Sequence, residues 1–149
     1  EYLLFLHADC RLPDDFQQIV QSVLSRERAA GAFRLRVQDP SWKLRWVEWG
    51  TNWRSRIFQT PYGDQALFLR ACDFFDLGGF RAIPIMEDYE FIRRLARRVR
   101  IHLADNAVET SARRWQKKGV WRTTLINQGM LLGYHLGVPL NRLAAWYRS

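Results

Sequence analysis

The chain has 149 residues, of which 48% are hydrophobic and 26% charged, and this composition excludes a disordered segment. The formal net charge is +8, and the excess lies entirely in the C-terminal part. Residues 1–91 hold 11 basic and 13 acidic side chains, whereas residues 92–149 hold 12 basic and 2 acidic ones. A basic half of this kind attracts nucleic acid, an anionic membrane surface or a phosphorylated substrate. The two cysteines lack metal-binding spacing, and we interpret them as reduced thiols of a cytoplasmic protein.

The first ten residues, EYLLFLHADC, contain an unbroken apolar run over residues 2–6, followed by His7 and Asp9. Such a run is typical of a strand buried on both faces, as in a parallel sheet. Strands of this kind place their working residues at the carboxyl end, where open α/β sheets bind ligands. Because a central strand is an unusual beginning for a domain, we expect the chain to be a fragment, incomplete at its N-terminus.

A helix, a strand and a second helix are predicted next. Residues 12–24 begin with a proline and two acidic residues, and their apolar side chains then fall on one helical face. Residues 32–37 alternate between apolar and basic side chains, as in a strand with one wet face. Residues 40–58 carry four tryptophans on one helical face, Trp42, Trp46, Trp49 and Trp53, flanked by basic residues. This helix suits a membrane interface, but we favour packing of its tryptophans on the core or along a substrate cleft.

The second half of the chain continues the alternation. The spacing of apolar and turn residues predicts a loop over residues 60–65 and a strand over 66–69. It then predicts helices over residues 71–77 and 87–98 and a strand over 99–103. Acidic residues open the helix over residues 87–98 and arginines close it, which suits the helix dipole. A basic loop and two helices complete the chain. The uncharged run over residues 123–141 is too polar for a good membrane span, and its regularly spaced glycines predict close packing. The sequence therefore predicts the α/β class.

Three short motifs carry side chains suited to chemistry. They are His7-Ala8-Asp9 at a strand end, Glu87-Asp88 at a helix start, and SARRW over residues 111–115. Each is weak alone, because an HxD triplet occurs by chance, an acidic pair often caps a helix, and an arginine pair is usually solvated.

The order and spacing of the motifs are more specific. FLHAD (residues 5–9), LGGF (77–80) and MEDYEF (86–91) occur in the order seen in family 2 glycosyltransferases, with SARRW as a weaker match to their Arg-Trp motif. The chain resembles the C-terminal part of that family over essentially all its residues, and most closely the bacterial arsenosugar-biosynthesis-type subgroup. The resemblance implies a GT-A fold, with a mainly parallel, Rossmann-like sheet flanked by helices. Residues 1–149 would then form the C-terminal part of a single domain, without its nucleotide-binding portion, and would be inactive alone.

The resemblance also implies an activity, in which a sugar passes from a nucleoside diphosphate sugar to an acceptor hydroxyl with inversion. It makes Asp88 the general base, with Glu87 as the less favoured alternative. The diphosphate and donor would contact Arg113, Arg114, Trp115 and His7. The residues in the loop suited to the acceptor are Tyr62, Asp64 and Gln65.

A metal ion is the expected cofactor. Asp9 matches the family's metal-binding position, and Mg²⁺ or Mn²⁺ would neutralise the diphosphate as a hard ion bound by carboxylate oxygen. His7 stands where the family usually has an aspartate. It would contact the donor or the metal, or hold a structural hydrogen bond, and the sequence leaves both roles open.

A different class of function is the main alternative. Arginines interleaved with aromatic residues suit a non-catalytic module that binds nucleic acid or an anionic membrane. No nucleic-acid motif is present and residues 1–91 are slightly acidic, so we expect no nucleic-acid partner. The expected partners are the nucleotide sugar and an unidentified acceptor. The expected location is the cytoplasm, with peripheral contact at the inner membrane face left open.

Overall fold

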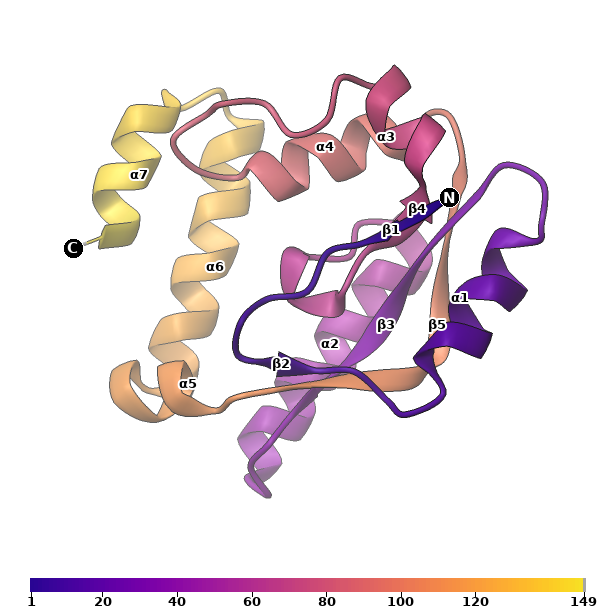
Figure 1. The fold of residues 1–149 in the computed structure, drawn as a ribbon. Helices are drawn as coiled ribbons and strands as arrows, with labels where there is room; N and C mark the ends of the chain where they lie inside the picture. Colours follow the sequence, from indigo (N-terminus) through magenta and orange to yellow (C-terminus); the bar gives the residue numbers. More distant parts are fainter. Residues whose placement is uncertain (149) are drawn as a thin grey trace.

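The computed structural model describes residues 1–148 and shows an α/β domain, in which helices pack around one five-stranded sheet (Figure 1). The strands lie in the order β1-β4-β3-β5-β2 and span Tyr2–Leu4, Phe68–Arg70, Ala29–Val37, Arg100–Thr110 and Cys10–Arg11. The helices are α1 Phe16–Leu24, α2 Trp42–Phe58, the 3₁₀ turn η1 Gly63–Gln65, α3 Ala71–Asp76, α4 Glu87–Leu95, α5 Arg113–Lys118, α6 Val120–His135 and α7 Leu140–Arg148. The predicted α/β class is confirmed.

The described sheet is mixed, so the prediction of a mainly parallel sheet is wrong for these strands. Only β3 and β5 pair in parallel, and the other three pairs are antiparallel. The reason lies in the segment after α2. Gln59 accepts a hydrogen bond from the N–H of Ile101 near the start of β5, whereas Gln65 already donates to the carbonyl of Phe33. The chain has therefore moved towards the carboxyl end of β3 before β4 begins, and β4 must run back.

Strand β1 lies at an edge of the sheet, not in its centre. Within residues 1–148 it pairs only with β4, and Tyr2 is 47% exposed. The predicted burial inside a parallel sheet is therefore wrong for the described residues. The strand is also shorter than the predicted run over residues 2–6, because it ends at Leu4, and His7 and Asp9 follow it after two further apolar residues.

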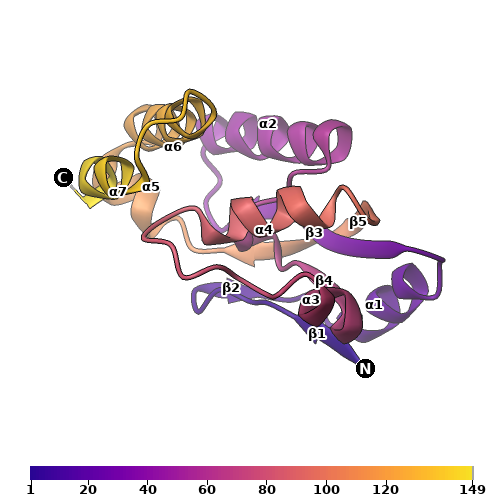
Figure 2. The same cartoon turned by 90° about the horizontal axis from the view of Figure 1, so that it is seen from above.

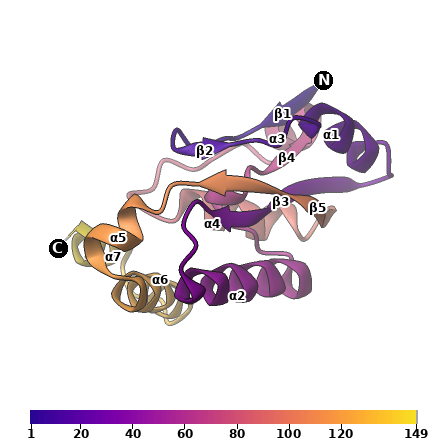
Figure 3. The ribbon, with the colours of Figure 1, turned by 90° about the horizontal axis from the view of Figure 1, so that it is seen from below.

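Three small cores hold the layers together. Helix α1 packs with Phe33 and Phe68 of the sheet, and α4 packs with Leu67 and Leu69 on the opposite face, because successive residues of β4 point to opposite sides. A third core joins the start of α2 to the buried Trp115. Figures 2 and 3 show α2 and α6 side by side, with α1 away from them beyond the sheet.

Several element boundaries differ from the sequence prediction. Strand β5 has 11 residues where five were expected, because its second half continues the parallel ladder with β3 past an irregularity between Ala32 and Arg34. Helix α4 ends at Leu95, and the C-terminal part holds three helices, since Gly119 (φ 84°) turns the chain between α5 and α6. Among residues 1–148, no helix is both long enough and apolar enough to cross a bilayer.

Helix α2 has nearly the predicted bounds but the opposite orientation. Its buried residues are Leu44, Glu48 and Ser55, whereas its four tryptophans are between 51% and 62% exposed. The favoured prediction was packing on the core or along a substrate cleft, and packing on the core is wrong. Trp46 and Trp49 do line a cavity, and its use as a substrate cleft stays a prediction. The polar face of α2 lies inward because it bonds the backbone of β3: Asn52 bonds both the N–H and the carbonyl of Leu35, and Glu48 accepts from the N–H of Val37. These backbone groups lie beyond the pairing with β4 and need partners.

Candidate functional site

A cavity of about 340 Å³ gathers most of the site residues that the sequence predicts. It lies between the segment after β1, the turn η1, the start of α4 and the helices α5 to α7, which surround one region in Figure 1. The predicted residues that line it are His7, Asp9, Tyr62, Asp64, Glu87, Asp88, Arg114 and Trp115. Two others, Gln65 and Arg113, do not line it.

Asp88 and His7 meet at the backbone of Gly63. The Gly63 N–H donates to Asp88 Oδ2 at 2.9 Å, and the Tyr89 N–H donates to Asp88 Oδ1 at 2.7 Å. A methyl group at Gly63 would lie 2.7 Å from His7 Nε2 and 2.8 Å from Asp88 Oδ2, so only glycine allows both side chains to approach. Just before α4, Met86 adopts a left-handed conformation (φ 66°), which is costly for a residue with a side chain. The carboxylate of Asp88 is thus fixed in orientation by backbone groups.

Asp64 is the acidic group with the most altered proton affinity in this cavity. Burial raises the pKa of Asp64 to about 6, and Asp88 adds to the rise, whereas His7 and Arg54 oppose it. Its Oδ1 atom is buried and has no hydrogen-bond partner. A carboxyl group with a pKa near neutral can both donate and accept a proton. The sequence placed Asp64 in the site but gave no sign of this shift, because burial depends on the tertiary structure.

Arg54 is a site residue that the sequence analysis missed. Its guanidinium lies 3.6 Å from the centre of the Tyr62 ring and donates to the carbonyl of Thr60. Arg54 is one of the basic residues that flank the tryptophans in the sequence, and no local signal shows that it turns inward. Burial raises the pKa of Tyr62 to about 12, so its hydroxyl stays protonated. That hydroxyl is also buried without a partner.

Gln65 braces the loop from behind the cavity. It is fully buried, its Oε1 accepts from Ser55 Oγ and from the Tyr62 N–H, and its Nε2 donates to the carbonyl of Phe33. These bonds hold the loop that presents Tyr62 and Asp64. Gln65 itself has no contact with the cavity through which it could meet an acceptor.

The helical side of the cavity carries the basic motif. Arg114 stacks at 4.6 Å over the ring of Tyr147 and donates to Asn127 at 3.4 Å. Trp115 is buried, and its Nε1 donor has no partner. Arg113 is exposed on α5 and lies outside the cavity. The cavity therefore has acidic groups on the sheet side and one arginine on the helical side.

A second cavity of about 350 Å³ lies between α2 and α6 and shares a wall with the first. The residues common to both are Tyr62, Asp64, Trp115 and Asn127. Three of these four carry a buried polar atom without a partner, and such atoms in a native protein usually meet water or a ligand. The shared wall therefore carries polar side chains at the border between the two cavities.

The donor set fits a hard metal ion only in part. Among residues 1–148, no group of three His, Cys, Asp or Glu side chains could hold an ion together. Mg²⁺ commonly takes one or two carboxylates and completes its shell with substrate phosphates and water. Asp9 is exposed and lines the cavity beside His7, which is enough for a site of that incomplete kind.

Comparisons of the chain with protein-family models, with curated proteins and with solved structures found no match. The resemblance to family 2 glycosyltransferases therefore rests on the sequence motifs.

Proposed function

We propose that the protein binds a nucleoside diphosphate sugar in this cavity and transfers the sugar, with inversion, to an acceptor hydroxyl. The observation that carries the proposal is the meeting of three motifs that are far apart in the chain. His7 and Asp9, Glu87 and Asp88, and Arg114 with Trp115 all line the one cavity. Glycosyl transfer requires the metal ligand, the general base and the groups that bind the diphosphate to lie in one cavity.

In this mechanism Asp88 is the general base. It takes the proton of the acceptor hydroxyl while the oxygen bonds the anomeric carbon and the bond from that carbon to the diphosphate breaks. The N–H groups of Gly63 and Tyr89 hold the carboxylate in place, which limits the reorganisation needed during transfer. Glu87 lies next to it at the cavity and is exposed, so it is the less favoured base.

The departing diphosphate needs positive charge. Arg114 can supply it from the opposite side of the cavity, since its guanidinium is held by Tyr147 and Asn127. Mg²⁺ or Mn²⁺, when bound through Asp9, would add charge neutralisation at the same phosphates. Tyr62 and Asp64 line the cavity where the acceptor would bind.

We also propose the GT-A arrangement for the complete sheet. The edge of β1 that is unpaired within residues 1–148 has the backbone groups to take a further strand. A parallel strand there would give β1 the buried position that its apolar run favours.

Binding and turnover test the proposal separately. The test uses the full-length enzyme that the resemblance implies. Titration calorimetry with a panel of uridine, guanosine and thymidine diphosphate sugars, with Mn²⁺, should find a donor that its Asp9→Ala variant no longer binds in a metal-dependent way. With that donor, Asp88→Asn should lower the turnover number by about 10² or more and leave donor binding nearly normal. Glu87→Gln is the matched control and should cost less.

Two results would contradict these assignments. Unchanged metal-dependent binding by Asp9→Ala removes Asp9 as the ligand, and normal turnover by Asp88→Asn removes it as the base. Circular dichroism of each variant distinguishes a lost function from a lost fold.

A further inference from the structure

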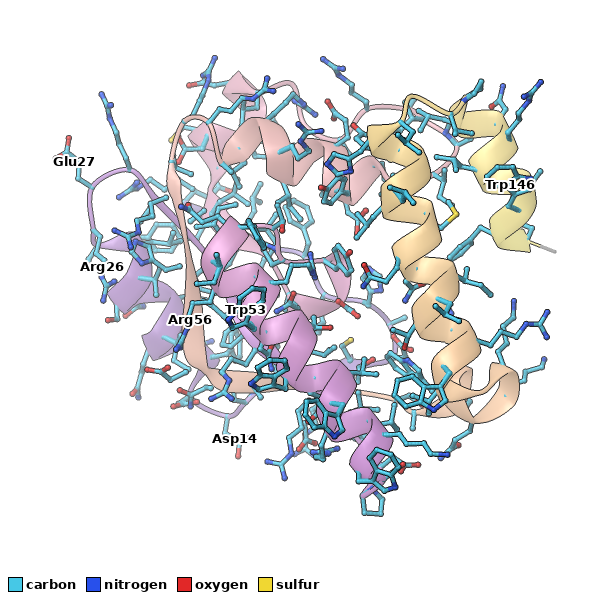
Figure 4. The ribbon with its side chains drawn as sticks, turned by 180° about the vertical axis from the view of Figure 1, so that it is seen from behind. Asp14, Arg26, Glu27, Trp53, Arg56 and Trp146 are labelled. Carbon is cyan, nitrogen blue, oxygen red and sulfur yellow. The ribbon has the colours of Figure 1, made fainter. Side chains whose placement is uncertain are left out.

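The outer side of α2 and the neighbouring start of α6 form an aromatic surface, which we call the tryptophan face. Its residues are Trp42, Trp46, Trp49, Trp53 and Phe58 of α2 and Trp121 and Leu125 of α6. All are more than half exposed. Figure 4 shows α2 in front with Trp53 on it, and Figures 2 and 3 show α2 and α6 side by side. Nothing in residues 1–148 covers these side chains.

This exposure follows from how α2 is anchored. Glu48 and Asn52 are bonded to the backbone of β3, and Ser55 donates to the buried Gln65. These three residues fix the rotation of the helix about its axis. Turning the tryptophans inward would break every one of these bonds and leave polar groups of β3 without partners. The fold therefore holds the tryptophans outward.

The aromatic rings form one continuous strip. Ring centres are 5.8 Å apart for Trp46 and Trp49, 6.4 Å for Trp49 and Trp53, and 6.0 Å for Trp53 and Phe58. These contacts run from Trp46 to Phe58, which corresponds to about 18 Å along the helix axis. A contiguous apolar surface of this extent marks an interaction site. Tryptophan is the residue that concentrates at the interface between a bilayer and water.

Most of the charges near the face are positive, with Asp39 and Asp105 as its acidic neighbours. Lys43 lies 5.9 Å from the ring centre of Trp42, Arg122 follows Trp121, and Lys117 and Lys118 end the helix that leads into α6. Residues 110–149 contain no aspartate or glutamate. Such a border complements a surface of negative charge, and anionic lipid head groups provide one.

We propose that the tryptophan face binds the surface of an anionic lipid bilayer. Helix α2 lies along the surface with its tryptophans at the level of the head groups, and Lys43, Lys117 and Arg122 face lipid phosphates. A second copy of the chain fits less well, because a symmetric contact would bring two like-charged borders together. The proposal does not depend on glycosyl transfer.

Docking in this orientation has a consequence for the second cavity. Trp46, Trp49 and Trp121 belong both to the tryptophan face and to the lining of that cavity, whose inner wall is shared with the candidate site. The side of the cavity formed by these tryptophans would then face the lipid head groups.

Vesicle flotation tests the proposal. The chain is mixed with large vesicles of phosphatidylcholine alone, or with about 30% phosphatidylglycerol added as the anionic lipid. We expect binding to the anionic vesicles that weakens by about tenfold or more in the double variant Trp46→Ser with Trp49→Ser. Brominated lipids should quench the tryptophan fluorescence of the bound protein. Lys117→Gln with Lys118→Gln should weaken binding and reduce its sensitivity to salt.

Phe75→Ser is the matched control, because Phe75 is 70% exposed on α3, away from the tryptophan face. It should bind as the unaltered chain does. If the double variant fails to fold, as judged by circular dichroism, Trp53→Ser and the bromolipid quenching of the unaltered chain give the same test.

Three outcomes would overturn the proposal. One is equal vesicle binding by the unaltered chain and the tryptophan variants. Another is a dimer in analytical ultracentrifugation that the double variant abolishes, with no vesicle binding, which would assign the face to a second copy. The third is binding to single-stranded nucleic acid through the same tryptophans in the absence of vesicle binding.

Discussion

The two sides of the candidate site are built in different ways. On the sheet side, His7, Gly63 and Asp88 are positioned by backbone hydrogen bonds and close approach, next to the buried cores of the sheet. On the helical side, Arg114 and Tyr147 are positioned by side-chain stacking on helices that are largely exposed. The sheet side is thus suited to holding catalytic groups in fixed positions, and the side chains of the helical side can adjust to a bound ligand.

The largest difference between the two sides should appear when an alanine replaces a buried glycine on each. A methyl group at Gly31 in β3 would lie 2.2 Å from the ring of Phe68, which is fully buried, so Gly31→Ala should cost about 3 kcal/mol of unfolding free energy. A methyl group at Gly133 in α6 would lie 2.7 Å from Leu143 Cδ2, the end of a side chain that is also fully buried, so Leu143 must shift to make room. The overlap is smaller than at Gly31, and alanine is the better helix former by about 1 kcal/mol, which offsets part of the cost, so Gly133→Ala should cost clearly less than Gly31→Ala. Urea unfolding measures both, and equal losses would contradict the comparison.

A smaller effect should come from the buried carboxyl on the sheet side. The pKa of Asp64 is raised from 3.8 to about 6 in the folded protein, so the folded state binds this proton more tightly than the unfolded state. Its contribution to stability is fully present below the unfolded pKa and is lost as the pH rises through about 6. Asp64→Asn should therefore stabilise the protein by roughly 2 kcal/mol at about pH 7.5, after a discount for partial exposure, and by little at about pH 4.

Urea unfolding of both proteins at the two pH values gives the measurement for Asp64. A gain of the same size at both values would show that the carboxyl is not the cause.

A substitution at Gly63 should change the geometry of the site without changing the overall stability of the protein. Gly63→Ala would displace the ends of His7 and Asp88, which can move at little cost to the fold, so unfolding free energy should change by less than about 1 kcal/mol. In the full-length enzyme, affinity for the nucleotide sugar should nevertheless fall by about tenfold, since a small misplacement weakens a preorganised site. Calorimetry and thermal unfolding measure the two quantities. Gly129→Ala is the control, because a methyl group there meets no atom within 4 Å; an equal loss of affinity in both variants would contradict the prediction.

The smallest effect on stability should come from the helical side. Arg114→Ala removes an exposed cation–π contact and should cost at most about 1 kcal/mol of unfolding free energy. In the full-length enzyme, diphosphate binding should weaken clearly, and Arg114→Lys should restore it only in part, since lysine keeps the charge but loses the planar fork. Calorimetry with the nucleoside diphosphate measures this. Arg113→Ala is the matched control outside the cavity, and an equal loss in that variant would show that the charge acts only at long range.

Much of the candidate site could be predicted from the sequence because its motifs are local. An apolar run ending in His7 and Asp9, and an acidic pair opening a helix, are visible in a few residues each. The resemblance to a known family then suggested that such distant segments meet. Arg54 was missed, because its inward direction depends on the contact with Tyr62 and on no pattern near it in the chain.

The sequence by itself determined the periodicity of the elements and the distribution of charge. The spacing of the tryptophans predicted a helix over residues 40–58, and α2 spans Trp42–Phe58. Periodicity shows which residues share a helical face, since that depends only on the turn of the backbone. It does not show which face is buried.

Only the tertiary structure decided which face of α2 is buried, in which direction β4 runs, and how strongly Asp64 binds its proton. Backbone groups of β3 that have no strand partner bind Asn52 and Glu48. The stabilisation from these hydrogen bonds outweighs what burial of the four tryptophans would have contributed. The direction of β4 was set by how far residues 59–65 travel along β3. The pKa of Asp64 rose because segments distant in the chain enclose it. Each outcome depends on partners that lie far away in sequence, and for that reason no local pattern contained it.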